Sequence, residues 1–268
     1  MDFIREIVDK DFFYHHSLTN RPMNDLFSLH MHDAFEILLL IKGDAKVNIE
    51  DRVYTLSPND LYFIYPGSFH RVLNGNNEPY ERKVIRFDYS FSRQFDPKDI
   101  LISSLRNSSI IRCEDVRKTR ILSLFDQLNR YLSYEDDLKR IACISVLSQL
   151  MLEISEAGAS FTDQNVGSPA NDRVASMIEF INDHLTEDLS LDRIASEFFI
   201  SKFHMSRIFK ESTGSSIGDF IIKKRLVLAK RLIFGGATPS SACIQSGFVD
   251  YSSFFKHYKK YFGFAPSA

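Results

Sequence analysis

The sequence contains few cysteines and no long run of apolar residues. Its three cysteines, Cys113, Cys143 and Cys243, are scattered and odd in number, which argues against a disulfide framework and against a cysteine-based zinc site. No apolar stretch is long enough to span a bilayer, and residues 1–16 lack the apolar run of a signal peptide. We therefore expect a cytoplasmic protein that has no membrane partner.

Two common sequence signatures of enzymes are also missing, because we find neither a glycine-rich phosphate loop nor a nucleophile–base pattern. What remains is a chain of 268 residues, of which 44% are hydrophobic and 25% are charged. This composition is typical of a globular protein, and the length suits two domains better than one.

The net charge of −2 hides an uneven distribution. Residues 198–268 contain eleven Lys and Arg against three Asp and Glu, whereas the rest of the chain carries a net charge of about −10. A basic tail on an acidic body is expected when only one end of a protein meets phosphate. A solvated basic helix face would give the same charge, so charge alone does not decide between the two.

Between residues 26 and 89 short apolar runs alternate with turn residues. One run, residues 61–64, lies between the turn residues 58–60 and Pro66-Gly67. Short strands at this spacing are typical of an antiparallel barrel or sandwich. We therefore assign residues 1–112 to an all-β domain.

Residues 113–156 change to a helical period, with a break at residues 133–136. The first apolar stripe consists of Ile121, Leu124, Leu128, Tyr131 and Leu132, and the second of Leu138, Ile141, Leu147, Leu150, Met151 and Ile154. Such a helix pair could simply cap the β domain, but two stripes offer more apolar surface than one small domain needs. We expect the pair to form the interface of a homodimer.

Residues 157–171 are small, polar and non-periodic, which is typical of a flexible linker. The remaining residues, 172–268, are predicted to form helices joined by short turns. The linker is therefore the expected boundary between an N-terminal and a C-terminal domain.

One segment of the C-terminal region occurs twice, because residues 201–210 align with residues 250–259 without a shift. Each copy begins at a Ser or Asp that can cap a helix N-terminus, and a glycine suited to a helix C-terminus follows it, Gly214 or Gly263. Each copy then has a large apolar residue, a cation and an aromatic residue beside a lysine at the same positions.

A shorter helix is predicted before each copy. Residues 190–195 lead into the first copy and residues 239–243 into the second, with Pro239 in a first turn that tolerates proline. A small residue, Ala195 or Cys243, stands where the two helices of each pair must approach closely. This arrangement is that of two helix-turn-helix units.

A long helix is predicted between the two units, over residues 216–234. As a rigid spacer it could hold the two reading helices about 34 Å apart, one turn of DNA, so that both enter the same face of the duplex. The helix also carries a series of cations: Lys223, Lys224, Arg225, Lys230 and Arg231.

The last third of the chain resembles the DNA-binding domain of the AraC/XylS family of transcription regulators. The residues that carry the resemblance are Ile194-Ala195, Ser201, Ser206 to Lys210, Gly214, Arg225-Leu226, Ala229, Gly247-Phe248, Asp250, Phe254, Lys259, Gly263 and Pro266. The resemblance implies an all-α domain with two helix-turn-helix units joined by a long helix. It implies double-stranded DNA as a partner, and RNA polymerase as a second partner if the protein activates transcription.

The outward positions of the two reading helices are the candidate DNA contacts. They are Lys202, Phe203, Ser206, Arg207 and Lys210 in the first helix and Tyr251, Ser252, Phe255 and Lys256 in the second. Arg207 is the candidate for a base contact, because a guanidinium can bind guanine through two hydrogen bonds, and Phe203 could lie against a thymine methyl group. For any one of these residues the alternative is surface charge or a packed aromatic ring. The inner positions, predicted as core, are Met205, Ile208, Phe209, Phe254 and Tyr258.

Two segments of the N-terminal region resemble the metal-binding motifs of cupins. His30, His32 and Glu36 resemble the ligands of the first motif and His70 that of the second, although Asn59 stands where the second motif has glycine. Strand alternation would direct the side chains of the first three residues into one interior. Three imidazoles and a carboxylate suit a divalent transition metal.

The sensor domains of AraC-type regulators share this barrel and often keep such residues without a metal, using the interior to bind a small effector. Three interpretations stay open: metal ligands, effector contacts that require no cofactor, and structural histidines. The candidate effector contacts are His30, His32, Glu36, His70, Phe35 and Tyr62. Their aromatic members would suit a sugar or a flat aromatic effector.

We therefore predict a dimeric transcription regulator, not an enzyme, with a cupin-like effector-binding barrel and a C-terminal double helix-turn-helix domain. The alternative is a cupin-type metal-dependent enzyme in which the helical region serves only assembly. That alternative predicts stoichiometric metal, turnover, and DNA binding without sequence preference.

Overall fold

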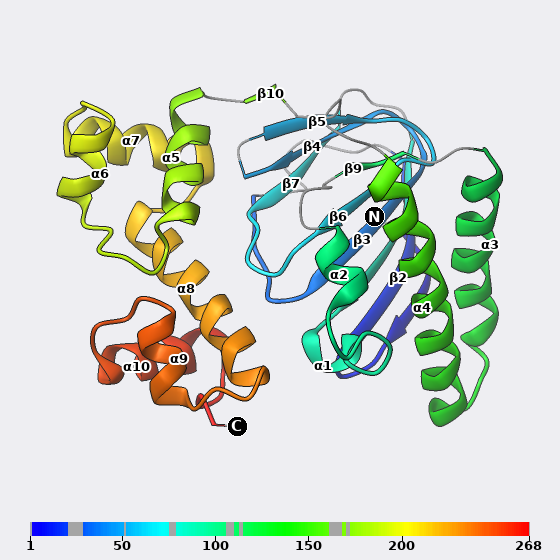
Figure 1. The fold of residues 1–268 in the computed structure, drawn as a ribbon. Helices are drawn as coiled ribbons and strands as arrows, with labels where there is room; N and C mark the ends of the chain where they lie inside the picture. The colour runs from blue at the N-terminus through cyan, green and yellow to red at the C-terminus, as the bar shows by residue number, and fades with distance from the viewer. Residues whose placement is uncertain are drawn as a thin grey trace.

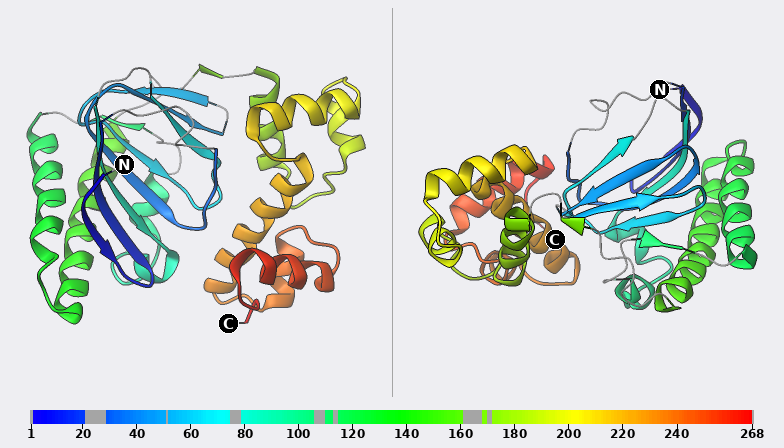
Figure 2. Two further views of the ribbon diagram at one scale, coloured as in Figure 1. Left: turned by 180° about the vertical axis from the view of Figure 1, so that it is seen from behind. Right: turned by 90° about the horizontal axis from the view of Figure 1, so that it is seen from above.

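The computed structural model describes residues 2–20, 29–50, 52–74, 79–105, 110–112, 115–160, 168–169 and 172–267. Figure 1 shows an N-terminal domain built on β-sheets and a helical C-terminal domain beside it, with a pair of long helices on the far side of the sheets. The two views of Figure 2 show the same order of layers. The predicted two-domain fold class is confirmed.

Two antiparallel sheets face each other in the N-terminal domain. The larger has the order β1 (Asp2–Val8), β2 (Phe12–Thr19), β8 (Tyr80–Phe87), β3 (Phe35–Lys42), β6 (Leu61–Ile64) and β9 (Ile110–Ile111). The smaller has the order β10 (Ser168–Pro169), β5 (Arg52–Leu56), β4 (Ala45–Ile49) and β7 (His70–Asn74). The strands therefore form two separate sheets and do not close into the predicted barrel.

Both faces of the larger sheet pack against an apolar core, as the central strand β3 shows. Its odd-numbered residues, among them Phe35, belong to the apolar core that packs against the long helices. Its even-numbered residues Leu38 and Leu40 belong to a second core, which lies between the two sheets. Glu36 shares their parity, so Phe35 and Glu36 lie on opposite faces of the sheet.

The helices of the N-terminal domain follow β8. They are α1 (Tyr89–Ser92), α2 (Ile100–Ser104), α3 (Asp115–Tyr131) and α4 (Asp136–Ser160). The predicted helix pair and the break between its members are confirmed. The second apolar stripe divides, however: Leu147, Leu150, Met151 and Ile154 are buried, whereas Leu138 and Ile141 are 53% and 64% exposed. The end of α4 also extends into the segment predicted as linker, of which residues 161–167 and 170–171 lie outside the described residues.

The C-terminal domain consists of helices arranged around one long helix, α8. The helices are α5 (Asp172–Asp183), α6 (Leu191–Glu197), α7 (Lys202–Thr213), α8 (Ile217–Phe234), α9 (Pro239–Gln245) and α10 (Tyr251–Phe262). Helices α6 and α7 pack at one end of α8, and α9 and α10 at the other, each pair with its own apolar core (Figure 1). In the described parts of the chain, no helix combines the length and apolar character needed to cross a bilayer.

The predicted ends of the reading helices α7 and α10 are confirmed. The Ser201 hydroxyl accepts a hydrogen bond from the backbone N–H of His204, and the Asp250 carboxylate accepts from two backbone N–H groups of the first turn of α10. Gly214 and Gly263 end the helices in the left-handed conformation, with φ of 69° and 82°.

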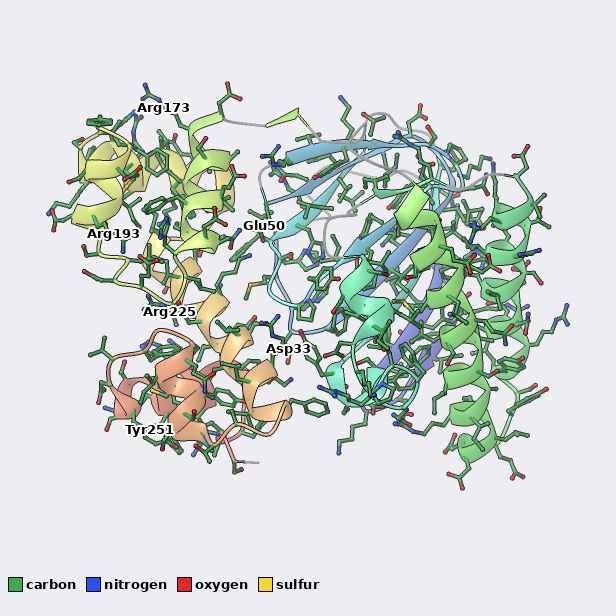
Figure 3. All side chains as sticks on the ribbon, in the orientation of Figure 1. Asp33, Glu50, Arg173, Arg193, Arg225 and Tyr251 are labelled. Carbon is green, nitrogen blue, oxygen red and sulfur yellow. The ribbon has the colours of Figure 1, made fainter. Side chains whose placement is uncertain are left out.

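Helix α8 also connects the two domains. The ring of Phe220 stacks on Phe69 with centroids 4.6 Å apart, and Lys224 Nζ donates to Glu50 Oε1 at 2.8 Å. A second ion pair, between Lys230 and Asp33, lies further along α8. Figure 3 shows Asp33 and Glu50 on the edge of the sheet domain that faces α8. The orientation of the helix-turn-helix units therefore depends on this edge.

The turn between α6 and α7 holds a side chain in an unfavourable conformation. Phe199 has a φ of 52° and is 95% exposed, so no packing compensates its left-handed backbone. The corresponding turn of the second unit has Gly247, with a φ of 88°. Glycine adopts this conformation without a steric penalty.

We expect Phe199→Gly to raise the free energy of unfolding by about 0.5–1 kcal/mol, because the left-handed penalty exceeds the entropy that glycine adds to the unfolded chain. Denaturant unfolding of the full chain measures the change. Val249→Gly is the matched control, since Val249 is an exposed turn residue whose φ is not left-handed, and it should lower stability. Equal stability changes in the two variants would contradict the strain at Phe199.

Candidate functional site

The predicted DNA contacts lie on the surfaces of α7 and α10. Ser206 is half-buried and the other eight are exposed: Lys202, Phe203, Arg207, Lys210, Tyr251, Ser252, Phe255 and Lys256. Of the residues predicted to face inward, Met205, Phe209, Phe254 and Tyr258 are buried and Ile208 is half-buried. The structure thus brings the nine candidates to the open faces of the two reading helices; their contacts with DNA remain a prediction.

The cations of α7 make weak, exposed interactions. Arg207 Nη2 lies 3.3 Å from His204 Nδ1, and Arg207 Nη1 lies 3.9 Å from a Glu211 carboxylate oxygen. Lys202 Nζ lies 2.9 Å from Asp192 Oδ1. Exposed pairs of this kind contribute little to stability, so phosphate or a base edge can displace them. His204 was not predicted as a site residue, and its contact with Arg207 depends on helical i, i+3 spacing.

Most of the cations of α8 face the protein. Lys224 and Lys230 pair with acidic residues of the N-terminal domain, and Lys223 Nζ lies 5.7 Å from the centroid of the Phe69 ring. Arg225 donates to the backbone carbonyls of residues 185 and 187, at 2.8 and 2.6 Å. The positive charge that faces outward for DNA therefore comes mainly from α7 and α10.

Three histidines of the N-terminal domain meet at the edge that faces the C-terminal domain. His30 and His70 pair through two backbone hydrogen bonds of 3.0 and 2.9 Å, and one ring nitrogen from each of His30, His32 and His70 lies within 4.8 Å of the others. Strand alternation does not cause this meeting, because β3 begins only at Phe35. A separate bridge to β7 places His30 instead.

Glu36, the fourth candidate of the cluster, already has strong partners. Its Oε1 accepts from the Tyr62 hydroxyl at 2.6 Å, and its Oε2 accepts from Arg86 Nε at 2.5 Å. Burial would raise the pKa of the Glu36 carboxyl, but the hydrogen bond from His32 and the charge of Arg86 hold that pKa well below its usual value. Arg86 was not predicted; it stands directly opposite Glu36 on the neighbouring strand β8.

His70 has one ring nitrogen without a hydrogen-bond partner among the described residues, and this atom lies in the cluster. Its Nδ1 lies 2.9 Å from the carbonyl oxygen of Ser68, so Nδ1 carries the proton. Its Nε2 has no hydrogen-bond partner among the described residues and lies 3.8 Å from Glu36 Oε1. Burial lowers the pKa of His70 to about 4, so the imidazole is neutral at pH 7. The side chain is only 1% exposed.

Further polar side chains line the inner face of the larger sheet. His15, Ser17 and Thr19 on β2 are buried and share a face with buried Arg82 on β8. The hydroxyls of Ser17 and Thr19 have no hydrogen-bond partner among the described residues. Sequence reasoning missed these residues because inward polar residues do not give the apolar alternation of a strand. Phe35, a predicted effector contact, lies on the other face.

Cavities between the two domains were also not predicted. One, of about 690 Å³, is lined by Phe12, Phe87, Ile233, Phe234 and Phe264 together with Lys230 and Arg86. A second, of about 530 Å³, lies between His30, Met31 and Phe69 on one side and Lys210, Ser215 and Asp219 on the other. Both are made by segments that are far apart in sequence, which explains why no local pattern indicates them.

Comparison with known proteins agrees with this two-part arrangement. The family model of an AraC-like ligand-binding domain matches residues 14–151, and the model of a helix-turn-helix domain matches residues 194–268. The first of these spans more than half of the chain.

Similar proteins are transcription regulators. The uncharacterized HTH-type transcriptional regulator YbfI of Bacillus subtilis is 25% identical over 243 residues, covering 84% of this chain and 80% of its own. The arabinose operon regulatory protein of Escherichia coli is 23% identical over 232 residues, covering 85% and 80%. The crystal structure of an apo variant of ToxT from Vibrio cholerae, 15% identical, covers 94% of this chain and 95% of its own with a TM-score of 0.43. The chain belongs to the AraC family of transcription regulators, with an N-terminal ligand-binding domain and a C-terminal DNA-binding helix-turn-helix domain.

Proposed function

We propose that this regulator reads two DNA half-sites through α7 and α10 and responds to an effector bound by its N-terminal domain. The observation that carries the proposal is the pair of open helix faces held at the two ends of α8. Their exposed cations and aromatic rings suit phosphate and base edges. The protein acts in the cytoplasm, with double-stranded DNA as its main partner.

Arg207 is the residue that we assign to direct base contact. Its guanidinium is exposed on α7 and is held only by His204 and Glu211 at 3.3 and 3.9 Å, so it is free to reorient. Lys256 has the corresponding place on α10. Phe203 and Phe255 are exposed on the same faces and suit thymine methyl groups.

The effector contacts that we propose are polar groups between the two sheets, at the edge of the N-terminal domain that faces α8: His30, His32, Glu36, His70 and Tyr62. This edge also holds α8, because Glu50 and Asp33 pair with lysines of that helix. A ligand that prefers one docking arrangement by about 1–3 kcal/mol would therefore change DNA binding usefully.

The exposed part of α4 is the dimer interface that we propose. Leu138, Ile141 and Leu152 are exposed on α4, on the side of the sheets away from the C-terminal domain (Figure 1). A second copy of the chain would cover these side chains and leave both DNA-binding domains free. If the dimer activates transcription, RNA polymerase is a further partner.

We propose no catalytic role. A cupin-type enzyme would account for the histidine cluster but would leave two helix-turn-helix units without a use. The histidines also lie beside the contacts that hold α8, where a bound ligand can affect the DNA-binding domain.

Loss of one outward cation from each reading helix should abolish the selection of a specific DNA site. The Arg207→Ala, Lys256→Ala double variant should lose a shared site with two half-sites one helical turn apart, because one base contact and a second phosphate or base contact disappear. Each good base contact discriminates by roughly 1–3 kcal/mol, so affinity for the selected site should fall at least about tenfold. Enrichment of genomic fragments at physiological salt measures the selection.

The control is Lys42→Ala, which removes one exposed positive charge at the end of β3, in the N-terminal domain. It should select the same fragments as the wild type. If wild-type protein selects nothing in the presence or absence of cell extract and metal, sequence-specific regulation is wrong. Measurement of metal content and turnover would then follow.

Charges placed on the exposed apolar residues of α4 should disrupt the proposed dimer. Leu138→Glu, Ile141→Glu should convert the dimer to a monomer, because two carboxylates would have to be buried without partners in the interface. Sedimentation equilibrium measures the mass. Ile244→Glu, a charge placed on an exposed apolar residue of α9 in the C-terminal domain, should remain dimeric. A monomeric wild type, or a dimeric double variant, would move the interface elsewhere.

A further inference from the structure

We propose that His30, His32 and His70 bind one divalent d-block metal ion, and that this ion is the ligand that controls docking of α8. The inference rests on the proposed regulatory function and names the ligand of the same site. It is carried by the geometry of the histidines and by their position among the residues that hold the DNA-binding domain.

The rings of His32 and His70 are oriented as in metal sites, where a backbone carbonyl accepts a hydrogen bond from the ring nitrogen that does not bind the metal. Nδ1 of His32 lies 2.9 Å from the Ala34 carbonyl oxygen, and Nδ1 of His70 lies 2.9 Å from the Ser68 carbonyl oxygen. A carbonyl accepts only from a protonated nitrogen, so Nδ1 of each ring carries a proton and Nε2 is the atom that each ring can offer to a metal. Hydrogen bonds from Nδ1 to carbonyls fix ligating histidines in this tautomer.

One ring nitrogen of the cluster has no hydrogen-bond partner. Nε2 of His70 is buried and finds none among the described residues. Nε2 of His32 lies 3.2 Å from Oε2 of the buried Glu36 carboxylate, so negative charge stands beside the three rings. A cation bound by the rings would use the Nε2 of His70 and would lie next to that negative charge.

The three ligand nitrogens also indicate which class of metal ion the cluster would bind. Three imidazole nitrogens suit Zn²⁺, Ni²⁺ or Co²⁺, whereas Mg²⁺ and Ca²⁺ prefer oxygen ligands. Glu36 is not needed as a ligand, because Tyr62 and Arg86 already occupy its oxygens. A three-histidine site leaves a position open to water or to a small oxygen ligand.

Metal binding would contract the cluster. The ligand atoms lie within 4.8 Å of one another, whereas nitrogens around a tetrahedral zinc with bonds near 2.1 Å are roughly 3.4 Å apart. The backbones of His30 and His70 are already joined by hydrogen bonds, so the rings and the segment around His32 must close.

That segment holds α8 through its immediate neighbours. The carbonyl of His32 accepts from the N–H of Gly67 at 2.9 Å, and a Cβ at Gly67 would lie 3.2 Å from a methyl group of Val227 on α8. Asp33 follows His32 and pairs with Lys230. Contraction of the cluster therefore acts directly on the docked helix.

Phe69 gives a second connection, since it precedes His70 and stacks on Phe220 of α8. Its N–H donates to Glu50 Oε1, the same oxygen that accepts from Lys224. His30 is exposed and lines the 530 Å³ cavity between the domains, so an ion can reach the cluster from solvent.

Metal binding is measured first, on the full chain after treatment with a chelator. Co²⁺ should give the visible absorption of a tetrahedral site at one ion per chain, and Zn²⁺ should displace it. His30→Gln, a change at an exposed position, and His70→Gln should each abolish the absorption. His16→Gln, which alters a histidine paired with Glu81 outside the cluster, should retain it. Circular dichroism establishes that each variant is folded.

Regulation is measured next, as the affinity of the full chain for its selected DNA site with Zn²⁺ and with chelator. Wild type and His16→Gln should change affinity by about 5- to 150-fold on addition of Zn²⁺, whereas His30→Gln should show the same affinity in both conditions. Lys224→Met should still bind Co²⁺ but respond less, because one docking contact is removed.

The outcomes separate the proposals. Absence of Co²⁺ binding in a chain that still selects a DNA site would overturn the metal site and leave the regulator intact. Co²⁺ binding with equal DNA affinity in both conditions would overturn control by the ion. Failure to bind any DNA site would overturn the proposed function, whether or not the cluster binds metal.

Discussion

The docking of α8 on the edge of the sheet domain is the interaction on which the arrangement of this protein depends. Lys224 and Glu50 are only 12% and 18% exposed, so their attraction is screened less than that of a surface pair, and loss of either partner would leave a charge poorly solvated. The same helix separates the two reading helices. One rigid element therefore both receives the state of the N-terminal domain and sets the orientation of the DNA-binding surfaces.

The features that the sequence predicts well are local ones. The helix-turn-helix repeat was found because Ser201 and Asp250 begin the two reading helices and Gly214 and Gly263 end them, and each of these roles depends on a few neighbouring residues. Apolar runs likewise predicted the buried strands β3 and β6. The sequence also predicted that His30, His32 and His70 lie close together. The expected cause, strand alternation, was wrong, because a bridge between His30 and β7 brings them together.

The features that were missed depend on tertiary structure. Strand β2 carries Ser17 and Thr19 on its buried face, so it lacks the apolar alternation from which strands are predicted. The role of Arg86 depends on the register that places it opposite Glu36. The cations of α8 look like phosphate contacts in a charge count, yet Lys224 and Lys230 face acidic residues of another domain. A count of charges cannot indicate which side of a helix is covered.

The docking contact is made of several separate interactions. It includes two partly exposed ion pairs, the stack of Phe69 on Phe220, the packing of Gly67 on Val227 and the ring contact of Tyr89 with Phe234. A ligand shifts an equilibrium only by its differential affinity for the two states, so it must act on contacts such as these. The histidine cluster lies one residue from two of these contacts, those of Asp33 and Phe69. A ligand bound there would act on these contacts through adjoining residues, which gives a physical route from the N-terminal domain to the helices that carry the DNA-binding surfaces.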